Sequence, residues 1–168
     1  MAEMHTNTVN MRPQDDVAWM EQALEQARLA AGAGEVPVGA LVIRDGEIVG
    51  RGHNRNLLDQ DPTAHAEIVA LRQAAKRLGN HRLGGCIVYA TIEPCSMCAG
   101  ALVHARISRL VYGASDPKAG ASGSVLQVIN YPGLNHKMEV TAGVLAQQCS
   151  EILQDFFRSK REAVANGE

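Results

Sequence analysis

Hydrophobic positions along the first third of the chain predict one helix followed by two strands. Apolar residues spaced three and four apart predict a helix from Asp15 to about Ala31, and Gly32-Ala33-Gly34 ends it. Two β-rich runs follow, Val36 to Ile43 and Ile48 to Gly52. The Asp45-Gly46 pair between them favours a tight hairpin, because its second position accepts positive φ.

The middle of the chain alternates helices with strands. Asp61-Pro62-Thr63 resembles a helix start, and the pattern predicts a helix from Ala64 to Leu78. A buried strand from Cys86 to Ile92, a helix from Glu93 to about Ala105 and a strand from Ile107 to Tyr112 follow. Such alternation predicts one three-layer α/β/α domain with right-handed crossovers and a mostly parallel five-stranded sheet. Active-site residues then belong at the carboxyl ends of strands.

The last third is rich in glycine before it returns to a regular pattern. Residues 113–133 predict an irregular functional loop with one short helix near 125–130. We expect an edge strand within 138–145 and a helix over 146–161 with a basic end. The domain therefore spans 15–161, with flexible ends at 1–14 and 162–168.

Composition and charge exclude several classes of protein. The 168 residues are 46% hydrophobic and 20% charged, which is typical of one globular domain and not of a disordered or fibrous chain. A net charge of -2 gives no global footprint for nucleic acid, so an RNA partner would need a local patch. Residues 1–10 lack the basic start and apolar run of a signal peptide, no stretch reaches the length of a membrane span, and the four cysteines suit a reducing compartment, so we expect neither a leader nor an anchor. We expect a cytoplasmic protein without a membrane partner.

Four residues carry the chemistry that the sequence suggests. His65, Cys95 and Cys98 offer three ligands, the number that a catalytic zinc uses while its fourth position stays open to water. Both ligand groups fall at predicted helix starts, where the helix dipole favours thiolates. Glu67 points about 200 degrees away from His65 around the helix axis, so it is a poor fellow ligand. It suits proton transfer beside a zinc-activated water.

Simpler interpretations exist for these residues and their neighbours. A lone CxxC also occurs in redox pairs and packed cores, and Glu67 could merely complement a helix dipole. Cys86 and Cys149 are predicted as small buried side chains, and His53 and His104 as structural or surface residues. Asn54 could be a turn residue, Phe156 and Phe157 are core by default, and 158–161 could be a solvated helix end that also suits phosphate contacts.

A His-x-Glu followed by Pro-Cys-x-x-Cys is the known signature of zinc-dependent nucleobase deaminases. The chain from about 15 to 161 resembles the bacterial tRNA-specific adenosine deaminases more narrowly. The segments that carry this resemblance are 37–40, 52–55, 61–67, 93–101 and 155–158. The resemblance implies a cytidine-deaminase-like fold, a homodimer, one Zn²⁺ per subunit, and conversion of the wobble adenosine of an arginine tRNA anticodon to inosine.

The resemblance also assigns residues to roles. It gives zinc to His65, Cys95 and Cys98, and proton transfer to Glu67. It gives substrate contacts to Asn54, Asp116, Phe157 and Arg158, which would meet the flipped nucleoside and the anticodon loop. The zinc motif alone leaves open a free-base or nucleoside deaminase acting on guanine, cytosine or cytidine. A non-catalytic zinc or RNA-binding module, which needs no Glu67, is the rival from another class.

Overall fold

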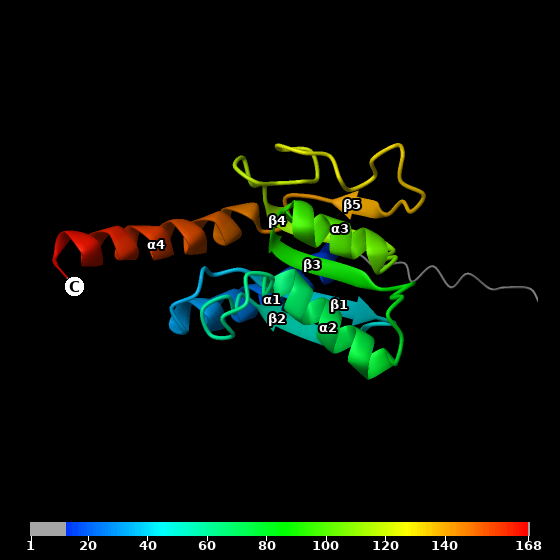
Figure 1. Ribbon diagram of the computed structural model, residues 1–168, viewed down its shortest axis with the longest axis horizontal. Helices are drawn as coiled ribbons and strands as arrows, with labels where there is room; N and C mark the ends of the chain where they lie inside the picture. The colour runs from blue at the N-terminus through cyan, green and yellow to red at the C-terminus, as the bar shows by residue number, and fades with distance from the viewer. Residues whose placement is uncertain (1–12, 168) are drawn as a thin grey trace, which may run out of the picture.

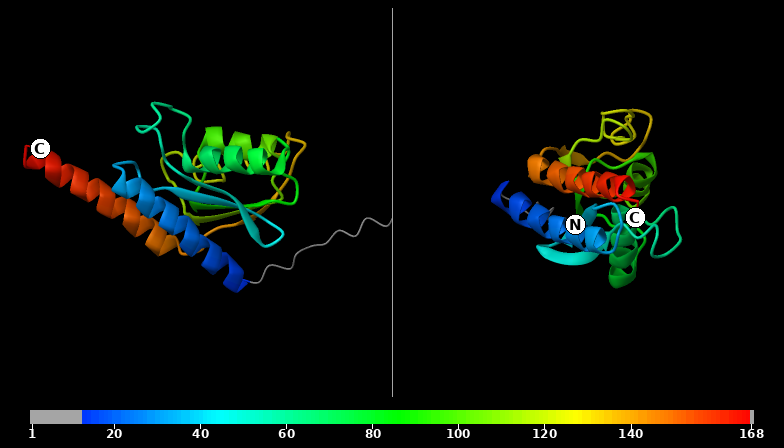
Figure 2. Two further views of the ribbon diagram at one scale, coloured as in Figure 1. Left: turned by 90° about the horizontal axis from the view of Figure 1, so that it is seen from below. Right: turned by 90° about the vertical axis from the view of Figure 1, so that its left-hand side faces the viewer.

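Residues 13–167, which the computed structural model describes, form four helices on the two faces of one five-stranded sheet. Helices α2 and α3 cover one face, α1 and α4 cover the other, and α4 extends well beyond the sheet (Figures 1 and 2). The elements are α1 (Pro13–Gly32), β1 (Gly39–Arg44), β2 (Glu47–His53), α2 (Ala66–Leu78), β3 (Ile87–Ile92), α3 (Ser96–His104), β4 (Arg109–Ala114), β5 (Glu139–Thr141) and α4 (Ala146–Ala165). The predicted three-layer architecture is confirmed.

The sheet is mixed, but four of its five strands run in one direction and only β1 is reversed, so the prediction of a mostly parallel sheet is confirmed. Its strand order is β2-β1-β3-β4-β5. Strand β1 pairs antiparallel with both β2 and β3, whereas β3, β4 and β5 are parallel. The hairpin explains the reversed direction of β1. Its first strand, β1, pairs with β3, so the crossover from β2 through α2 to β3 passes over β1. Strand β5 lies at the sheet edge, as predicted.

Tight turns and small residues bring the helices close to the sheet. Asp45 (φ 51°) and Gly46 (φ 76°) form the two-residue connection between β1 and β2, which confirms the predicted hairpin. Gly50 and Gly52 face α2 so closely that a Cβ on either would lie 2.3 Å from a helix carbonyl oxygen. Only glycine therefore fits at these two positions of β2.

Two helices begin later than the sequence pattern predicted. Helix α2 starts at Ala66 rather than Ala64, because the Asp61 carboxylate accepts hydrogen bonds from the Thr63 amide and hydroxyl and so forms a separate turn. Helix α3 starts at Ser96 rather than Glu93, because Pro94 is held in an extended segment whose carbonyl accepts the Ala121 amide at 2.8 Å. Each shift moves a predicted metal ligand onto a helix N-cap.

The ends and the long loop also depart from the predictions. No helix forms over 125–130; the amides of Val125 and Leu126 donate to the Gly120 carbonyl instead. Helix α4 continues to Ala165, four residues beyond its predicted end, and includes part of the predicted flexible segment 162–168. Of the predicted flexible segment 1–14, residues 1–12 lie outside the described residues, and α1 already begins at Pro13.

A buried ion pair joins α1 to the sheet. Asp16 accepts two hydrogen bonds from Arg109 at 2.7 and 2.8 Å and one from the Tyr89 hydroxyl at 2.7 Å. Burial alone would raise the pKa of Asp16, but these hydrogen bonds and the Arg109 charge outweigh it and lower the pKa. Within residues 13–167, no helix combines the length and the apolar character that crossing a membrane requires.

Candidate metal and deaminase site

Three predicted metal ligands converge where α2 and α3 begin. His65 is the N-cap of α2, Cys95 is the N-cap of α3, and Cys98 lies in the first turn of α3. Their ligand atoms all lie within 4.8 Å of one another, and His65 Nδ1 is 3.6 Å from Cys95 Sγ and 3.5 Å from Cys98 Sγ. Tetrahedral zinc with ordinary Zn–N and Zn–S bonds sets nitrogen and sulfur about 3.5 Å apart. The geometry therefore fits a zinc ion with three protein ligands.

The two cysteine ligands differ in acidity, because the thiol of one donates a hydrogen bond to the sulfur of the other. Hydrogen bonds from Cys98 and then His65 lower the pKa of the Cys95 thiol. The pKa of Cys98 is raised, because its thiol donates to Cys95 and because it is buried. Both cysteines lie at a helix N-terminus, which stabilises negative charge. Cys86 and Cys149 are buried elsewhere in the core, as predicted.

Glu67 lies beside the three ligands without being one of them. It occupies the first turn of α2, its residue is 3% exposed, and its carboxyl group hydrogen-bonds Cys98. Burial raises the pKa of this carboxyl group. A carboxyl group with a raised pKa exchanges protons more readily near neutral pH than an exposed one.

A cleft of about 850 Å³ opens over the ligands. It is lined from the segment before β1, the residue after β2, the start of α2, the ends of β3 and β4, the loop after β4 and one side of α4. The lining includes every predicted site residue except Cys98, which is buried behind it: Asn54, His65, Glu67, Cys95, Asp116, Phe157 and Arg158. Sequence reasoning missed other lining residues, namely Glu93, Ser115 and Lys118, whereas Arg161 belongs to the 158–161 segment that it considered for phosphate contacts. A charged residue at the end of the buried strand β3 was the available signal for Glu93.

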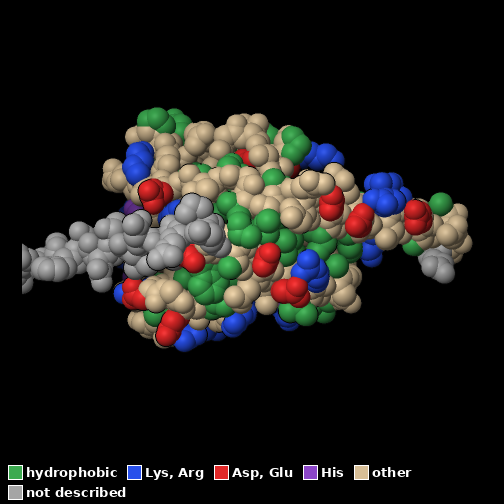
Figure 3. Space-filling view, turned by 180° about the vertical axis from the view of Figure 1, so that it is seen from behind, with side chains coloured by type: hydrophobic (Ala, Val, Ile, Leu, Met, Phe, Trp, Pro, Cys, Tyr) green, Lys and Arg blue, Asp and Glu red, His purple; other side chains and the backbone are tan. Residues whose placement is uncertain are grey.

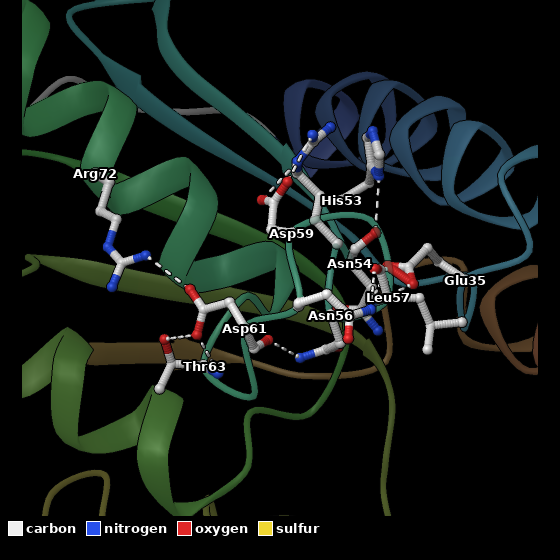
Figure 4. Close-up of polar contacts among 11 residues, drawn as sticks. Glu35, His53, Asn54, Asn56, Leu57, Asp59, Asp61, Thr63 and Arg72 are labelled. Atoms are coloured by element: carbon white, nitrogen blue, oxygen red, sulfur yellow. Dashed lines mark hydrogen bonds and ion pairs between the residues drawn. The ribbon is translucent and has the colours of Figure 1, made fainter.

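Asn54 has a structural role in addition to its place in the cleft. Its Oδ1 accepts a hydrogen bond from the Ala66 amide at 2.9 Å, so a residue after β2 satisfies the start of α2. The loop that follows is held by Glu35, whose carboxylate accepts the Leu57 amide at 2.7 Å, and by the Asp61 turn (Figure 4). The Asn54 amide nitrogen makes none of the hydrogen bonds found among residues 13–167 and is left for another partner.

The other predicted substrate residues lie at the rim of the cleft. Asp116 Oδ1 accepts the amides of Lys118 and Ala119, so this carboxylate partly organises its own turn. Phe157 is 44% exposed and lines the cleft, so it is not the core residue that it was expected to be by default, and it lies where the alternative, a pocket-lining role, places it. Arg158 is exposed and hydrogen-bonds Asp155. These residues approach the cleft from two sides.

Figure 3 shows the face of the molecule that lies behind the view of Figure 1, and charge is distributed evenly over it. Acidic and basic side chains are interspersed there, and neither sign forms a continuous patch (Figure 3). The cleft differs, because Lys118, Arg158 and Arg161 line it from two segments of the chain. Its rim therefore brings together three basic residues and the acidic Asp116, and the basic residues are the ones available for phosphate contacts.

The fold, the three-ligand metal site and the buried carboxylate together are typical of a deaminase. Residues 14–161 match the family model described as MafB19-like deaminase, and the chain belongs to this deaminase family. It is 48% identical over 157 residues to the tRNA-specific adenosine deaminase of Haemophilus influenzae, with 93% of this chain and 91% of the relative covered.

Two solved structures extend the comparison. One comes from studies of A-to-I editing by tRNA:A34 deaminases at the wobble position of transfer RNA, and has a TM-score of 0.79, 45% identity and coverage of 81% of this chain and 99% of that chain. The other is a guanine deaminase from Nitrosomonas europaea, with a TM-score of 0.74, 27% identity and 83% coverage of each chain. The fold is thus shared by enzymes for polymeric and for free-base substrates.

Proposed function

We propose that this protein is a zinc-dependent tRNA-specific adenosine deaminase that converts the wobble adenosine of a tRNA anticodon to inosine. The observation that carries this proposal is the placement of Glu67 beside three residues that fit a zinc ion, in a cleft of about 850 Å³ that is large enough for a nucleoside. The likeness to a tRNA-specific adenosine deaminase over more than nine tenths of both chains supports the choice of substrate.

In this proposal the chain's own residues divide the reaction between them. Zinc, when bound by His65, Cys95 and Cys98, supplies Lewis-acid activation of a water molecule. Glu67 accepts a proton from the attacking water and donates it to the purine ring nitrogen. It then takes the proton of the hydroxyl group that has been added to the carbon and donates it to the departing amino group, which leaves as ammonia. Its burial suits this exchange, because burial raises the pKa of the carboxyl group above that of an exposed glutamate.

Substrate binding in this proposal uses the remaining predicted residues. The Asn54 amide nitrogen donates to the flipped base, while its oxygen keeps the start of α2 in place. Asp116, Phe157 and Arg158 contact the anticodon loop at the rim, where an aromatic ring stacks on a base and a guanidinium pairs with phosphate. We further propose that the substrate is an arginine tRNA, that the protein assembles as a homodimer and that it acts in the cytoplasm.

The decisive experiment incubates the zinc-loaded protein with an arginine tRNA anticodon stem-loop and sequences the product for adenosine-to-inosine change. The Glu67→Ala variant should keep one zinc per chain and its fold but form no inosine, whereas Glu47→Ala, at an exposed position on β2, should behave as wild type. Deamination of guanine or cytidine without any change in the stem-loop would favour the free-base alternative. Normal turnover by Glu67→Ala would contradict the role given to this carboxylate.

A further inference from the structure

Glu93 is a buried carboxylate between the metal site and the loop after β4. It follows the last residue of β3 and is 1% exposed. Its two oxygens accept hydrogen bonds from the amides of Asp116 (3.2 Å), Ser122 (3.0 Å) and Ser124 (3.2 Å), and from the Ser124 hydroxyl. Among residues 13–167, no Lys or Arg forms an ion pair with it, so every observed partner of this carboxylate comes from one loop.

Backbone contacts bring the same two segments together. The Glu93 amide donates to the Ala114 carbonyl at 2.8 Å, and the Ala121 amide donates to the Pro94 carbonyl at 2.8 Å. The loop backbone at Gly120 lies directly on the carboxylate, because a Cβ there would be 2.3 Å from Glu93 Oε2. This approach leaves no room for any residue larger than glycine.

The loop from Ser115 to Ser124 supplies five consecutive residues, 115–119, to the wall of the cleft. Asp116 and Lys118 belong to this wall, and Glu93 binds the Asp116 amide directly. We infer that Glu93 is a positioning residue: it holds the 115–124 loop in the conformation that binds RNA, so it sets substrate affinity rather than the chemical step. This inference rests on the proposed function.

A neutral side chain of the same size cannot replace this carboxylate. Glutamine keeps one acceptor oxygen, but its amide nitrogen would face backbone N–H groups and leave at least one buried donor without an acceptor. Such a loss should weaken the binding of the stem-loop by a factor of about ten or more. The Glu93→Gln variant should therefore raise the KM for the anticodon stem-loop at least about tenfold and change kcat by less than about threefold.

Binding is measured separately in a Glu67→Ala background, in which the stem-loop is not turned over. Adding Glu93→Gln there should weaken the Kd for the stem-loop by about the same factor, while both proteins keep one zinc per chain. A second variant approaches the contact from the loop side: Gly120→Ala forces the loop off the carboxylate and should raise the KM similarly. Its matched control is Gly84→Ala, at an exposed glycine whose added Cβ meets nothing within 4 Å.

Two results would overturn the inference. An unchanged KM and Kd in both Glu93→Gln and Gly120→Ala would show that binding does not depend on this contact. A loss of zinc, or a fall in kcat with unchanged KM, would show that Glu93 serves the nearby ligand Cys95 instead. Failure of the wild-type protein to form inosine would instead refute the proposed function, and the Kd comparison would still report on the loop.

Discussion

Replacing Gly52 with alanine should damage both the stability and the active site of this protein. The added Cβ would lie 2.3 Å from the Ala66 carbonyl oxygen and 2.6 Å from the Ala70 amide nitrogen. Non-bonded heavy atoms prefer about 3.5 Å, so the start of α2 must move by about 1 Å. Overpacking of this kind costs about 1–3 kcal/mol in the free energy of unfolding. A displacement of about 1 Å at reacting groups can lower a rate by about a hundredfold.

Gly50→Ala is the matched control for this prediction. Its added Cβ would lie 2.3 Å from the Ala70 carbonyl oxygen, one turn further along α2 and away from His65. Both variants should lose similar stability in urea unfolding, but only Gly52→Ala should lose zinc affinity and most of its kcat. Wild-type zinc content and kcat in Gly52→Ala, or an equal loss of activity in both variants, would refute the reasoning that the β2 contact positions the metal site.

Three further predictions concern the metal, acid stability and RNA binding. Cys98→Ser should lose zinc in metal analysis of the purified protein; one zinc per chain in that variant would contradict the ligand set. Asp16→Asn should reduce the free energy of unfolding at pH 7 by about 3 kcal/mol, because Arg109 stays buried without its charged partner. Because the pKa of Asp16 is lowered in the folded state, this stabilisation is complete above about pH 4 and is lost as pH falls through the folded-state pKa. In urea unfolding, the difference in free energy of unfolding between the wild-type protein and Asp16→Asn should therefore be smaller at pH 3 than at pH 7. Arg158→Ala should weaken stem-loop binding and reduce the slope of log Kd against log salt by about 1, and an unchanged slope would argue against a phosphate contact.

Local sequence signals predicted which residues lie together at the site. His65, Glu67, Cys95 and Cys98 could be singled out because the residue types and spacing of a metal site are themselves chemical requirements. The Asp45-Gly46 hairpin was predictable for a similar reason, since its turn depends on two adjacent residues. Contacts between distant residues were not predictable: the cap of α2 comes from Asn54, twelve residues before Ala66, and no local pattern reveals it.

The position of β1 in the sheet and the conformation of the loop after β4 also depend on contacts between distant residues. Alternating strands and helices favour a parallel sheet, but the position of β1 between β2 and β3 depends on which strand of the hairpin pairs with the rest. The segment 125–130 has a helical pattern, yet the loop before it is held by a carboxylate some 30 residues away, and its own amides bond to Gly120. Tertiary hydrogen bonds overrode the local preference there.

The position of the metal ligands on two helix N-caps has a thermodynamic consequence. His65 and Cys95 are 30 residues apart in sequence, so an ion held between them acts as a cross-link that closes a long segment of chain, including α2 and β3. Because the unfolded chain does not preserve this arrangement, binding and folding are linked. Each tenfold rise in free zinc above its Kd adds about 1.4 kcal/mol to the free energy of unfolding. The melting temperature of this protein should therefore report the zinc concentration of its solution.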